Sequence, residues 1–471
     1  MRSEGVGETP NRSRISRYLP IFLLAAVIAA LWLVPGSDLK SKTLIDAALL
    51  VGFAIACWAF GWLAEPATTL VFFLLVVVFR VAKPEVVFSG FTSSAWWLVL
   101  GGSITAIAVQ TTGLGRRLAG LLLGRAAGSY PRAVTTVALA AVGLAFLMPS
   151  TNGRIMLLMP IVLAFAERLG LAPGRPGYMG LVLTVAAASY MPPTTILPAN
   201  VPNSILLGAA ESLYGVKLAY GPYLLLHFPI LGALKTAALI WLVCRLFPER
   251  EALRPTSFED LGPLSREERW LAWLLALSLL LFATDFIHGI SPAWVSLGTG
   301  LLCFLPPLGL VTPADFSARI NVVMLIYIAG ILGLGAVVAD SGLSAAVSER
   351  LLAWANLTPG HNVGNVATLS AIGAGLAALT TATGVPAVLT PLAQEFASAS
   401  GLPLLTVLML QVVPFSTVFL PFESPPIMVA LHLGGVGVRP ANKLCLALAA
   451  VTVLVLLPLD YLWWRLLGYL P

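Results

Sequence analysis

The sequence predicts an all-α polytopic membrane protein, and its composition, its apolar runs and an internal repeat all point to that class. Of the 471 residues, 58% are hydrophobic and only 10% are charged. A soluble domain needs roughly a quarter of its residues charged to keep its surface hydrated. A chain with so little charge must be solvated by the lipid bilayer, which is therefore its first expected partner.

Apolar stretches that can cross the hydrocarbon core, at about 20 residues each, recur along the chain. We expect eleven transmembrane helices, at residues 18–36, 44–63, 66–82, 95–114, 177–208, 220–246, 270–289, 292–310, 320–340, 403–435 and 442–467. Two more apolar segments, 133–166 and 363–398, have a polar break near the middle. Irregular backbone at membrane depth must be buried in protein or line a cavity. Both segments are therefore predicted to be re-entrant hairpins.

The Lys and Arg residues predict how the chain is oriented. Residues 1–17 form a basic tail, and the apolar run after it shows no signal-peptide cleavage pattern, so it is expected to remain as the first helix. Basic residues also gather in segments 116–132 and 245–269. Because cytoplasmic loops are enriched in Lys and Arg, we place all three segments in the cytoplasm. Eleven crossings of the inner (cytoplasmic) membrane then leave the C-terminus outside.

The long polar segment 247–269 divides the chain into two predicted halves. The expected domains are a cytoplasmic tail (1–17), a first repeat (18–246) with hairpin 133–166, a cytoplasmic linker (247–269) and a second repeat (270–471) with hairpin 363–398. The net charge of +6 reflects the loops and does not indicate nucleic-acid binding.

Three pairs of motifs support the division into repeats. The pairs are TTGL with DSGL around Gly113 and Gly342, STNG (150–153) with TATG (381–384), and LPANVPNSI (197–205) with LPFESPPIM (420–428). They occur in the same order and at nearly equal separations, and the predicted crossings give the two halves opposite topology. Inverted repeats with broken helices at matching positions are typical of secondary transporters.

Each predicted hairpin has a polar tip. The tip residues are Ser150, Thr151, Asn152 and Gly153 in the first hairpin and Thr380, Thr381, Thr383 and Gly384 in the second. Such oxygens, with unwound carbonyls, can coordinate Na⁺, while helix N-termini attract anions. A single cluster of this kind commonly hydrogen-bonds only within its own helix. Two clusters at matching positions favour a binding function.

Proline-rich breaks follow both tips. In the first half, Pro192-Pro193-Thr194-Thr195 and Pro198-Ala-Asn200-Val-Pro202-Asn203 cannot form a continuous helix, because each proline removes a backbone donor. The same is expected of residues 421–426 in the second half. We expect these breaks to present carbonyls and helix ends beside the tips.

These motifs resemble the divalent-anion:sodium symporter family, which carries dicarboxylates, citrate and sulfate. The resemblance runs from about Trp96 to the C-terminus. The family's Ser-Asn-Thr tips are matched here by Ser150-Thr-Asn152 and Thr381-Ala-Thr383, and its Pro-Pro-Asn-type second break by Pro425-Pro-Ile427, so the order or identity of single residues departs from the family pattern. The resemblance implies eleven helices with two hairpins, scaffold and transport domains that move as an elevator, and a homodimer. The implied function is Na⁺-coupled symport of a small di- or polyanion, with a dicarboxylate such as succinate expected first.

Matching the motifs residue by residue, and adding the nearby polar groups, yields the candidate site. The expected substrate contacts are Ser150, Thr151, Asn152, Arg154, Asn200, Pro202, Asn203, Thr381, Thr383, Ser424 and Pro425. The expected cation contacts are Ser150, Asn152, Gly153, Thr195, Thr381, Thr383, Gly384 and Glu423. Apart from Na⁺ as coupling ion, no cofactor or metal is expected.

Two charged residues depart from the family pattern. Arg154 follows the first tip, and Glu423 lies within the second break. A charged residue at membrane depth costs roughly 2.5–3.5 kcal/mol and needs a cavity or a partner. Arg154 can neutralise a bound dianion or replace a sodium ion, and Glu423 can pair with Arg154, take up a proton or hold a cation. Symport, cation-independent exchange and proton-linked exchange therefore all stay open.

Other function classes fit the sequence less well. An integral-membrane enzyme or an ATP-driven pump would need a nucleophile–base pair, a metal cluster or a nucleotide motif, and the sequence contains none. The paired hairpins favour alternating access over a channel pore. A membrane sensor that binds ligand without transporting it remains the alternative.

Overall fold

A computed structural model describes residues 14–33, 39–123, 129–249, 251, 262–306 and 308–471. The regular structure in these ranges is helical and includes no strand, which confirms the predicted all-α class. Residues 1–13 of the predicted N-terminal tail, and residues 250 and 252–261 of the predicted linker, lie outside the described residues.

The first half of the described chain ends at α13. Its elements are α1 (Arg14–Leu33), α2 (Leu39–Phe60), α3 (Glu65–Val78), α4 (Pro84–Val87), α5 (Ser89–Thr92), α6 (Ser94–Thr112), α7 (Leu114–Leu123), α8 (Tyr130–Leu147), α9 (Thr151–Arg168), α10 (Pro176–Tyr190), η2 (Pro192–Thr195), α11 (Val201–Tyr214), α12 (Tyr220–His227), η3 (Phe228–Leu234) and α13 (Lys235–Leu246).

The second half begins at α14. Its elements are α14 (Arg266–Ala283), α15 (Asp285–His288), α16 (Pro292–Phe304), α17 (Pro313–Arg319), α18 (Val322–Asp340), α19 (Leu343–Ala355), α20 (Asn362–Leu379), α21 (Gly384–Leu389), η4 (Thr390–Leu392), α22 (Ala393–Ser400), α23 (Leu404–Leu410), α24 (Val412–Ser416), η5 (Pro421–Glu423), α25 (Pro425–Leu433), α26 (Val438–Val451), η6 (Thr452–Leu456) and α27 (Leu457–Leu466).

Several helices are long and apolar enough to cross a membrane. Among the described residues, six meet that test on length and composition, and the pair α6–α7, bent by 69°, is either a seventh, broken span or a re-entrant loop. Other expected spans are divided into shorter helices, because the predicted proline breaks separate α10 from α11 and α24 from α25. Helix length therefore supports a polytopic protein, and eleven crossings stay a prediction.

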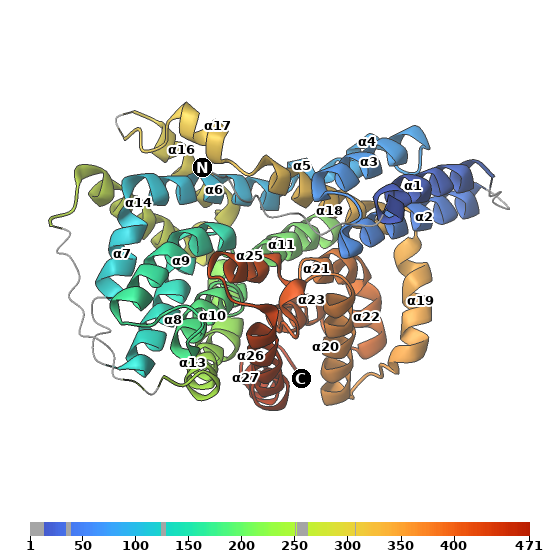
Figure 1. The fold of residues 1–471 in the computed structure, drawn as a ribbon. Coiled ribbons are helices and arrows are strands. Elements are labelled where there is room, and N and C mark those ends of the chain that lie inside the picture. The colour runs from blue at the N-terminus through green and yellow to red at the C-terminus, as the bar shows by residue number, and fades with distance from the viewer. Residues whose placement is uncertain (1–13, 34–38, 124–128, 250, 252–261, 307) are drawn as a thin grey trace.

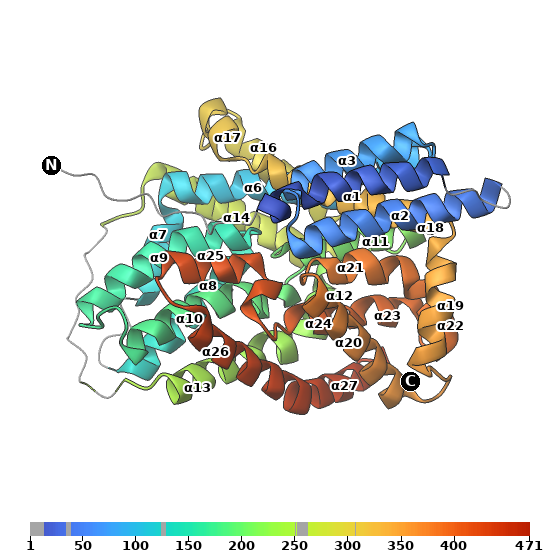
Figure 2. The same cartoon turned by 45° about the vertical axis from the view of Figure 1, so that its right-hand side comes forward.

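The helices form two layers (Figures 1 and 2). In both views α1–α6, α16, α17 and α18 lie in the upper layer, while α8, α10, α13, α20, α26 and α27 lie in the lower one. Helices α7 and α19 stand near opposite ends of the molecule and run from the upper layer to the lower one. The two predicted hairpins, α8–α9 and α20–α22, thus lie on either side of the centre.

Matching glycines mark the bends that lead into α7 and α19. Gly113 separates α6 from α7 with a φ of 82°, and Gly342 separates α18 from α19 with a φ of 74°. Both angles lie in the left-handed region, which glycine adopts without a steric penalty. These two glycines occupy the same place in the paired motifs TTGL and DSGL, and their shared conformation supports the internal repeat.

Close contact between α6 and α16 stabilises the upper layer. A Cβ atom added to Gly101 would lie 2.5 Å from the carbonyl oxygen of Ser296, and one added to Gly300 would lie 2.9 Å from the carbonyl oxygen of Gly101. Small residues allow membrane helices to approach this closely and to gain van der Waals contact. The pair positions α6, which forms one wall of the cavity described below.

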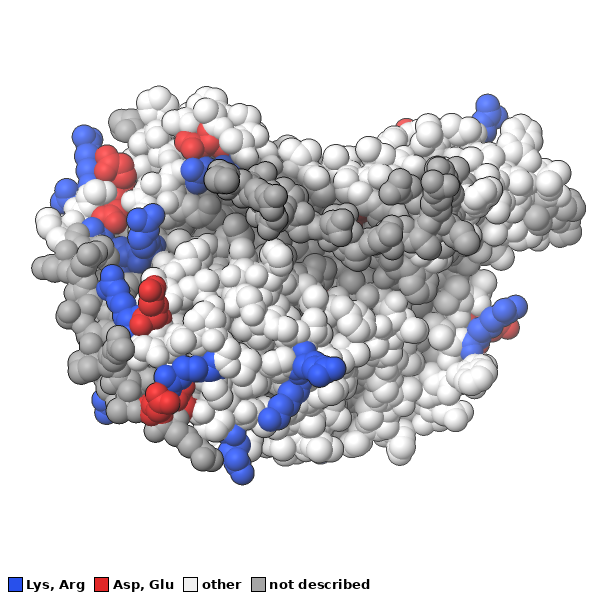
Figure 3. Space-filling model, viewed as in Figure 1, with Lys and Arg blue, Asp and Glu red and all other residues white. Residues whose placement is uncertain are grey.

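Few charged side chains appear on the face shown in Figure 3. They gather mainly toward the left-hand side, with one basic group in the lower middle, and the surface between these groups is largely uncharged. Exposed apolar side chains such as Leu70, Leu74 and Trp241 are each at least 55% accessible. Such a surface matches the lipid-facing exterior that the composition predicts.

Candidate functional site

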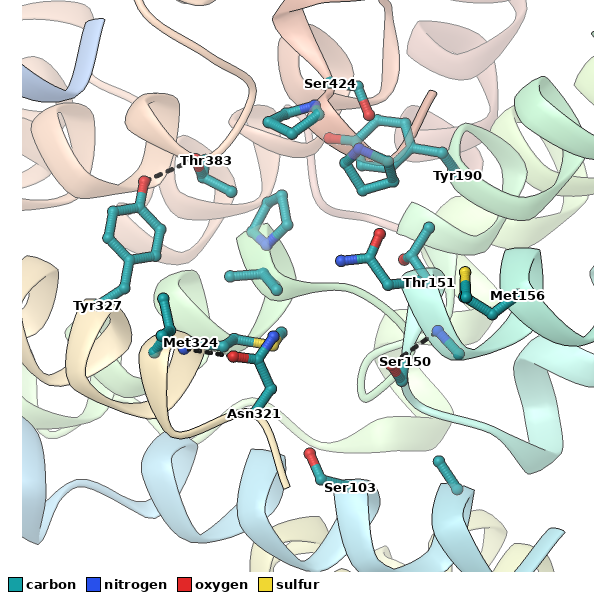
Figure 4. Close-up of a pocket in the computed structure, with 18 of the residues that line it drawn as sticks. Ser103, Ser150, Thr151, Met156, Tyr190, Asn321, Met324, Tyr327, Thr383 and Ser424 are labelled. Atoms are coloured by element: carbon teal, nitrogen blue, oxygen red, sulfur yellow. Dashed lines mark hydrogen bonds between the residues drawn. The ribbon is translucent and has the colours of Figure 1, made fainter. Parts of the chain in front are cut away.

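The tip of each hairpin and the break of each half border one cavity of about 360 Å³. Figure 4 shows Ser150 and Thr151 on one side of it, Thr383 and Tyr327 on another, and Asn321 and Ser103 on the wall formed by the upper layer. Its remaining polar lining includes Glu65, Gln110, Asn152, Tyr190, Arg319, Glu423 and Ser424.

The first tip is a non-helical step between α8 and α9. The backbone becomes extended at Met148, with φ −124° and ψ 97°, and helix α9 begins after Ser150. The Ser150 hydroxyl accepts a hydrogen bond from the backbone N–H of Gly153 at 3.2 Å, and so acts as the N-cap of α9. The four tip residues Ser150 to Gly153 all line the cavity, as the candidate site requires.

Arg154 is fully buried and does not line the cavity. Its guanidinium donates to five oxygen atoms from the tip, the end of α10 and the first break: the carbonyls of Met148, Ser189 (2.8 Å) and Ala199 (3.1 Å), Asn200 Oδ1 (3.0 Å) and Thr151 Oγ1 (3.2 Å). The described residues include no ion pair between Arg154 and Glu423. The arginine thus holds the first half of the site together from behind.

The first break is held by its own side chains. Asn200 precedes α11, and its Nδ2 donates to the carbonyl of Tyr190 at 2.8 Å. Asn203 Nδ2 donates to the carbonyl of Ile196 at 2.8 Å, and Thr195 Oγ1 to that of Pro192 at 2.6 Å. Of the candidates in this break, Pro202 lines the cavity, whereas Thr195, Asn200 and Asn203 lie behind its surface.

The second tip lies between α20 and α21. The hydroxyls of Thr381 and Thr383 are 2.7 Å apart, and that of Thr383 is 3.0 Å from the Tyr327 hydroxyl. Thr383 and Ala382 line the cavity, whereas Thr381 and Gly384 do not. Tyr327, on α18 of the upper layer, therefore contacts a tip in the lower layer.

Glu423 organises the second break. Its carboxylate accepts hydrogen bonds from the backbone N–H groups of Phe419 and Leu420, each at 3.1 Å. Its own carbonyl accepts one from the N–H of Ala382 at 2.8 Å, which ties the break to the second tip. Both Glu423 and Ser424 line the cavity, and the buried Ser424 hydroxyl has no partner among the described residues. Pro425, another candidate, lies beside them on the cavity wall.

Three helices begin at the cavity wall: α9 after Ser150, α11 after Asn200 and α25 after Ser424. The first turn of each supplies lining residues. Free backbone N–H groups and the helix dipole make a helix N-terminus attractive to anions. Pro425 and Pro426 at the start of α25 have no N–H group, so α9 and α11 supply backbone donors and α25 contributes its dipole alone. These helix ends at one cavity suit an anionic ligand.

Sequence reasoning missed the upper-layer wall of the cavity. Ser103, Gln110, Asn321 and Tyr327 line it, but only the folded chain brings them opposite the tips. Gln110 offered a signal, since it is an amide inside the apolar repeat motif around Gly113. Asn321 caps α18 by accepting from the N–H of Met324 at 3.0 Å, a role that explains it without a ligand.

The fold and cavity define a polytopic membrane transporter. The chain belongs to the family described as the sodium:sulfate symporter transmembrane region, which matches residues 15–470. This finding confirms the suspected family, and the named relatives are transporters and not enzymes.

Two curated relatives carry informative names. The sodium-dependent dicarboxylate transporter SdcS of Staphylococcus saprophyticus is 24% identical over 343 residues, 65% of each chain. The L-tartrate/succinate antiporter of Escherichia coli (strain UTI89) is 25% identical over 312 residues, 58% of this chain and 61% of the relative. Both matches span less than two thirds of the relative's length.

A solved structure shares the fold. The YdaH transporter of Alcanivorax borkumensis superposes with a TM-score of 0.58 at 17% sequence identity, over 96% of this chain and 98% of that one. At this identity the likeness concerns the fold alone.

Proposed function

We propose that the chain is a secondary carrier of small dianions, with a dicarboxylate such as succinate as the expected substrate. The observation that carries the proposal is the convergence of both tips and both breaks on one cavity, at which the N-termini of α9 and α11 begin. A cavity of about 360 Å³ matches a small organic anion. The names of the two curated relatives, a dicarboxylate transporter and a tartrate/succinate antiporter, support the same substrate class.

We propose that the two halves of the site handle charge differently. The first half contains a fixed cation, because the Arg154 guanidinium is surrounded by five oxygens of the kind that coordinate Na⁺. The second half contains an anion, Glu423, beside the unpartnered Ser424 hydroxyl and the Thr383 hydroxyl. A coupling Na⁺ then binds in the second half only, with Glu423 as its charged neighbour.

Cation-independent exchange of anions is the second candidate function. Arg154 favours it, because a built-in positive charge can stabilise the dianion without a co-transported ion. In that case the Glu423 carboxylate stabilises the second break by accepting hydrogen bonds from the N–H groups of Phe419 and Leu420, or takes up a proton during exchange.

We further propose that the two layers move against each other. The upper layer, with α1–α7 and α14–α19, is assigned as scaffold, and the lower layer, with α8–α13 and α20–α27, as transport domain. The Tyr327–Thr383 contact crosses between these groups and must break when they slide. A homodimer, an N-terminus in the cytoplasm and a C-terminus outside the inner membrane complete the proposal.

Uptake of labelled succinate into proteoliposomes tests the function. It is measured with an inward Na⁺ gradient, with no gradient, and with unlabelled succinate inside, using citrate and sulfate as competitors. Dependence on Na⁺ supports symport, and dependence on internal substrate supports exchange. Binding of succinate without flux supports a sensor, and neither binding nor flux with any of the three anions contradicts the dianion proposal.

A further inference from the structure

Two oppositely charged side chains are buried away from the cavity. Lys235 begins α13 and is 0% exposed, and Asp460 lies on α27 and is 2% exposed. Neither lines the cavity, and the proposed transport chemistry uses neither. A buried charge costs several kcal/mol unless nearby groups compensate it, so this pair needs an explanation.

Both residues follow a π-helical turn at a matching place in the two halves. The turn η3 interrupts the 27-residue helical segment Tyr220–Leu246, and η6 interrupts the 29-residue segment Val438–Leu466. The two turns pack against each other, and α27 also packs against η3. π-helical turns are rare and occur frequently at functional sites.

Lys235 is bonded to the element that leads into the second break. Its ammonium donates to the carbonyl of Ser416 at 2.7 Å and to the Ser416 hydroxyl at 3.3 Å. Ser416 is the last residue of α24, and the chain from there to α25 carries Glu423 and Ser424 to the cavity. The lysine is thus a link between the first repeat and the second half of the site.

Asp460 forms no ion pair in the described part of the chain. The Trp464 side chain on the same helix interacts with its carboxylate, but Asp460 Oδ1 is buried and makes no hydrogen bond there. The charges of Asp460 and Lys235 act on each other, yet no ion pair within 4.0 Å joins them in that part. The ammonium is therefore bonded to Ser416, while the Asp460 carboxylate interacts with it without a direct ion pair.

The surrounding elements add few ionisable groups. The turns η3 and η6 and helix α24 contain no charged residue. His227 on α12 has no hydrogen bond at either ring nitrogen and packs between Tyr223 and Trp464, at 4.6 and 5.5 Å between ring centroids. On α26 the ionisable residues are the exposed Arg439 and Lys443 and the buried Cys445, and on α10 they are Tyr178 and Tyr190. Helix α8, which also packs against α13, carries the buried Tyr130 and the exposed Arg132.

We propose that Asp460 and Lys235 form a proton-binding site that controls the second break, an inference that rests on the proposed carrier function. A proton from bulk water forms an O–H bond at Asp460 Oδ1 and removes the negative charge. Lys235 then has Ser416 as its only strong partner, and the end of α24 is held in place. When the proton leaves, the carboxylate attracts the ammonium away from Ser416, and the break that carries Glu423 and Ser424 is released.

Exchange of labelled for unlabelled succinate in proteoliposomes, across about pH 5 to pH 9, tests the site. The variant Asp460→Asn imitates the protonated state, so its exchange rate is expected to stay flat with pH where the unmodified protein changes by about fivefold or more. Lys443→Gln, which removes an exposed lysine on α26, is the matched control and should keep the original pH response. Glu423→Gln distinguishes Asp460 from Glu423 as the source of the effect. The exchange rate of Glu423→Gln should keep the pH response that Asp460→Asn loses.

Two results would overturn the proposal. One is an unchanged pH response in Asp460→Asn. The other is a double variant, Lys235→Met with Asp460→Asn, that exchanges succinate with the original pH response, since the pair would then be structural only.

A readout that does not need transport separates this inference from the proposed function. The midpoint of thermal unfolding in detergent should depend on pH differently in the unmodified protein and in Asp460→Asn, because a proton bound in one state alone links stability to pH. Identical pH dependence contradicts the proton site even if succinate is not a substrate. Absence of succinate flux in every variant, with a pH-linked difference in unfolding, contradicts the carrier function and leaves the proton site standing.

Discussion

The two halves of the site carry opposite charges at different positions of the repeat: Arg154 directly follows the first tip, whereas Glu423 lies within the second break. In the first half, Arg154 lies behind the tip and donates to five oxygens of the tip, α10 and the first break. In the second half, Glu423 lies on the cavity wall and accepts from the break's own N–H groups. One half therefore holds a buried positive charge behind the cavity, and the other has a carboxylate on the cavity wall. The comparison shows that two copies of a repeat can keep the same order of hairpin tip and helix break while their charged residues differ.

Arg154→Met should have the largest effect on this comparison. It removes the guanidinium from five oxygens, of which Asn200 Oδ1 still accepts from the Thr151 hydroxyl. Each oxygen that stays unpaired costs about 1–3 kcal/mol, so succinate exchange is expected to fall at least about 100-fold. Arg154→Lys keeps the charge but not the planar fork of donors and should retain part of the rate.

A rescue experiment separates charge from folding in the first half. Guanidinium ion added to Arg154→Ala proteoliposomes should restore part of the exchange, because it can re-enter the same oxygen shell. Equal rates for Arg154→Met and the unmodified protein would show that the first half needs no fixed cation.

Glu423→Gln tests the second half. Loss of the carboxylate removes the charged ligand proposed for Na⁺ and weakens hydrogen bonds to two backbone N–H groups. A charge-assisted contact contributes about 1.5–3 kcal/mol, so the Na⁺ concentration for half-maximal uptake should rise by roughly tenfold or more. Glu349→Gln on α19 changes an exposed carboxylate and is the control. An unaltered Na⁺ requirement in Glu423→Gln would remove this residue from the cation site.

Ser424→Ala should have a smaller effect. The hydroxyl lines the cavity without a protein partner, so its loss should raise the KM for succinate by about three- to tenfold, equivalent to one ordinary hydrogen bond. Ser398→Ala removes an exposed hydroxyl on α22 and should leave the KM unchanged. A KM for Ser424→Ala that equals that of the control argues against a role for this hydroxyl in binding.

Gly113→Ala and Gly342→Ala test whether the halves share their bends as well as their sites. Each alanine would occupy a left-handed backbone position, at a cost of about 1–2 kcal/mol, so both variants should unfold at lower temperature in detergent by similar amounts. Gly143→Ala, in the middle of α8 with open space around the added methyl, is the control and should be neutral or stabilising. Destabilisation in only one of the two variants would break the proposed equivalence.

The tips and breaks could be predicted because their chemistry is local. Proline pairs and glycine beside hydroxyl or amide groups interrupt an apolar run, and such an interruption needs a reason wherever it occurs. The structure places all four motifs around one cavity, with Ser150 to Gly153, Pro202, Thr383 and Glu423 to Pro425 on its surface.

The direction of each side chain could not be predicted in the same way. Arg154 directly follows the cavity-lining Gly153, yet it points to the opposite side, where the carbonyls of Ser189 and Ala199 converge. Those carbonyls are brought there by the fold and have no signature in the sequence. The same holds for Gln110 and Asn321, which become part of the cavity only because α6 and α18 of the upper layer face the tips.

The most direct test of the account is the number of Na⁺ ions that accompany each succinate. The central claim is that Arg154 supplies the positive charge of the first half, so that only the second half takes a mobile cation. Uptake measured against Na⁺ concentration should then show a Hill coefficient of no more than about one, and Glu423→Gln should shift that curve. A coefficient of about two or more in the unmodified protein would contradict the claim, because both halves would then be binding Na⁺.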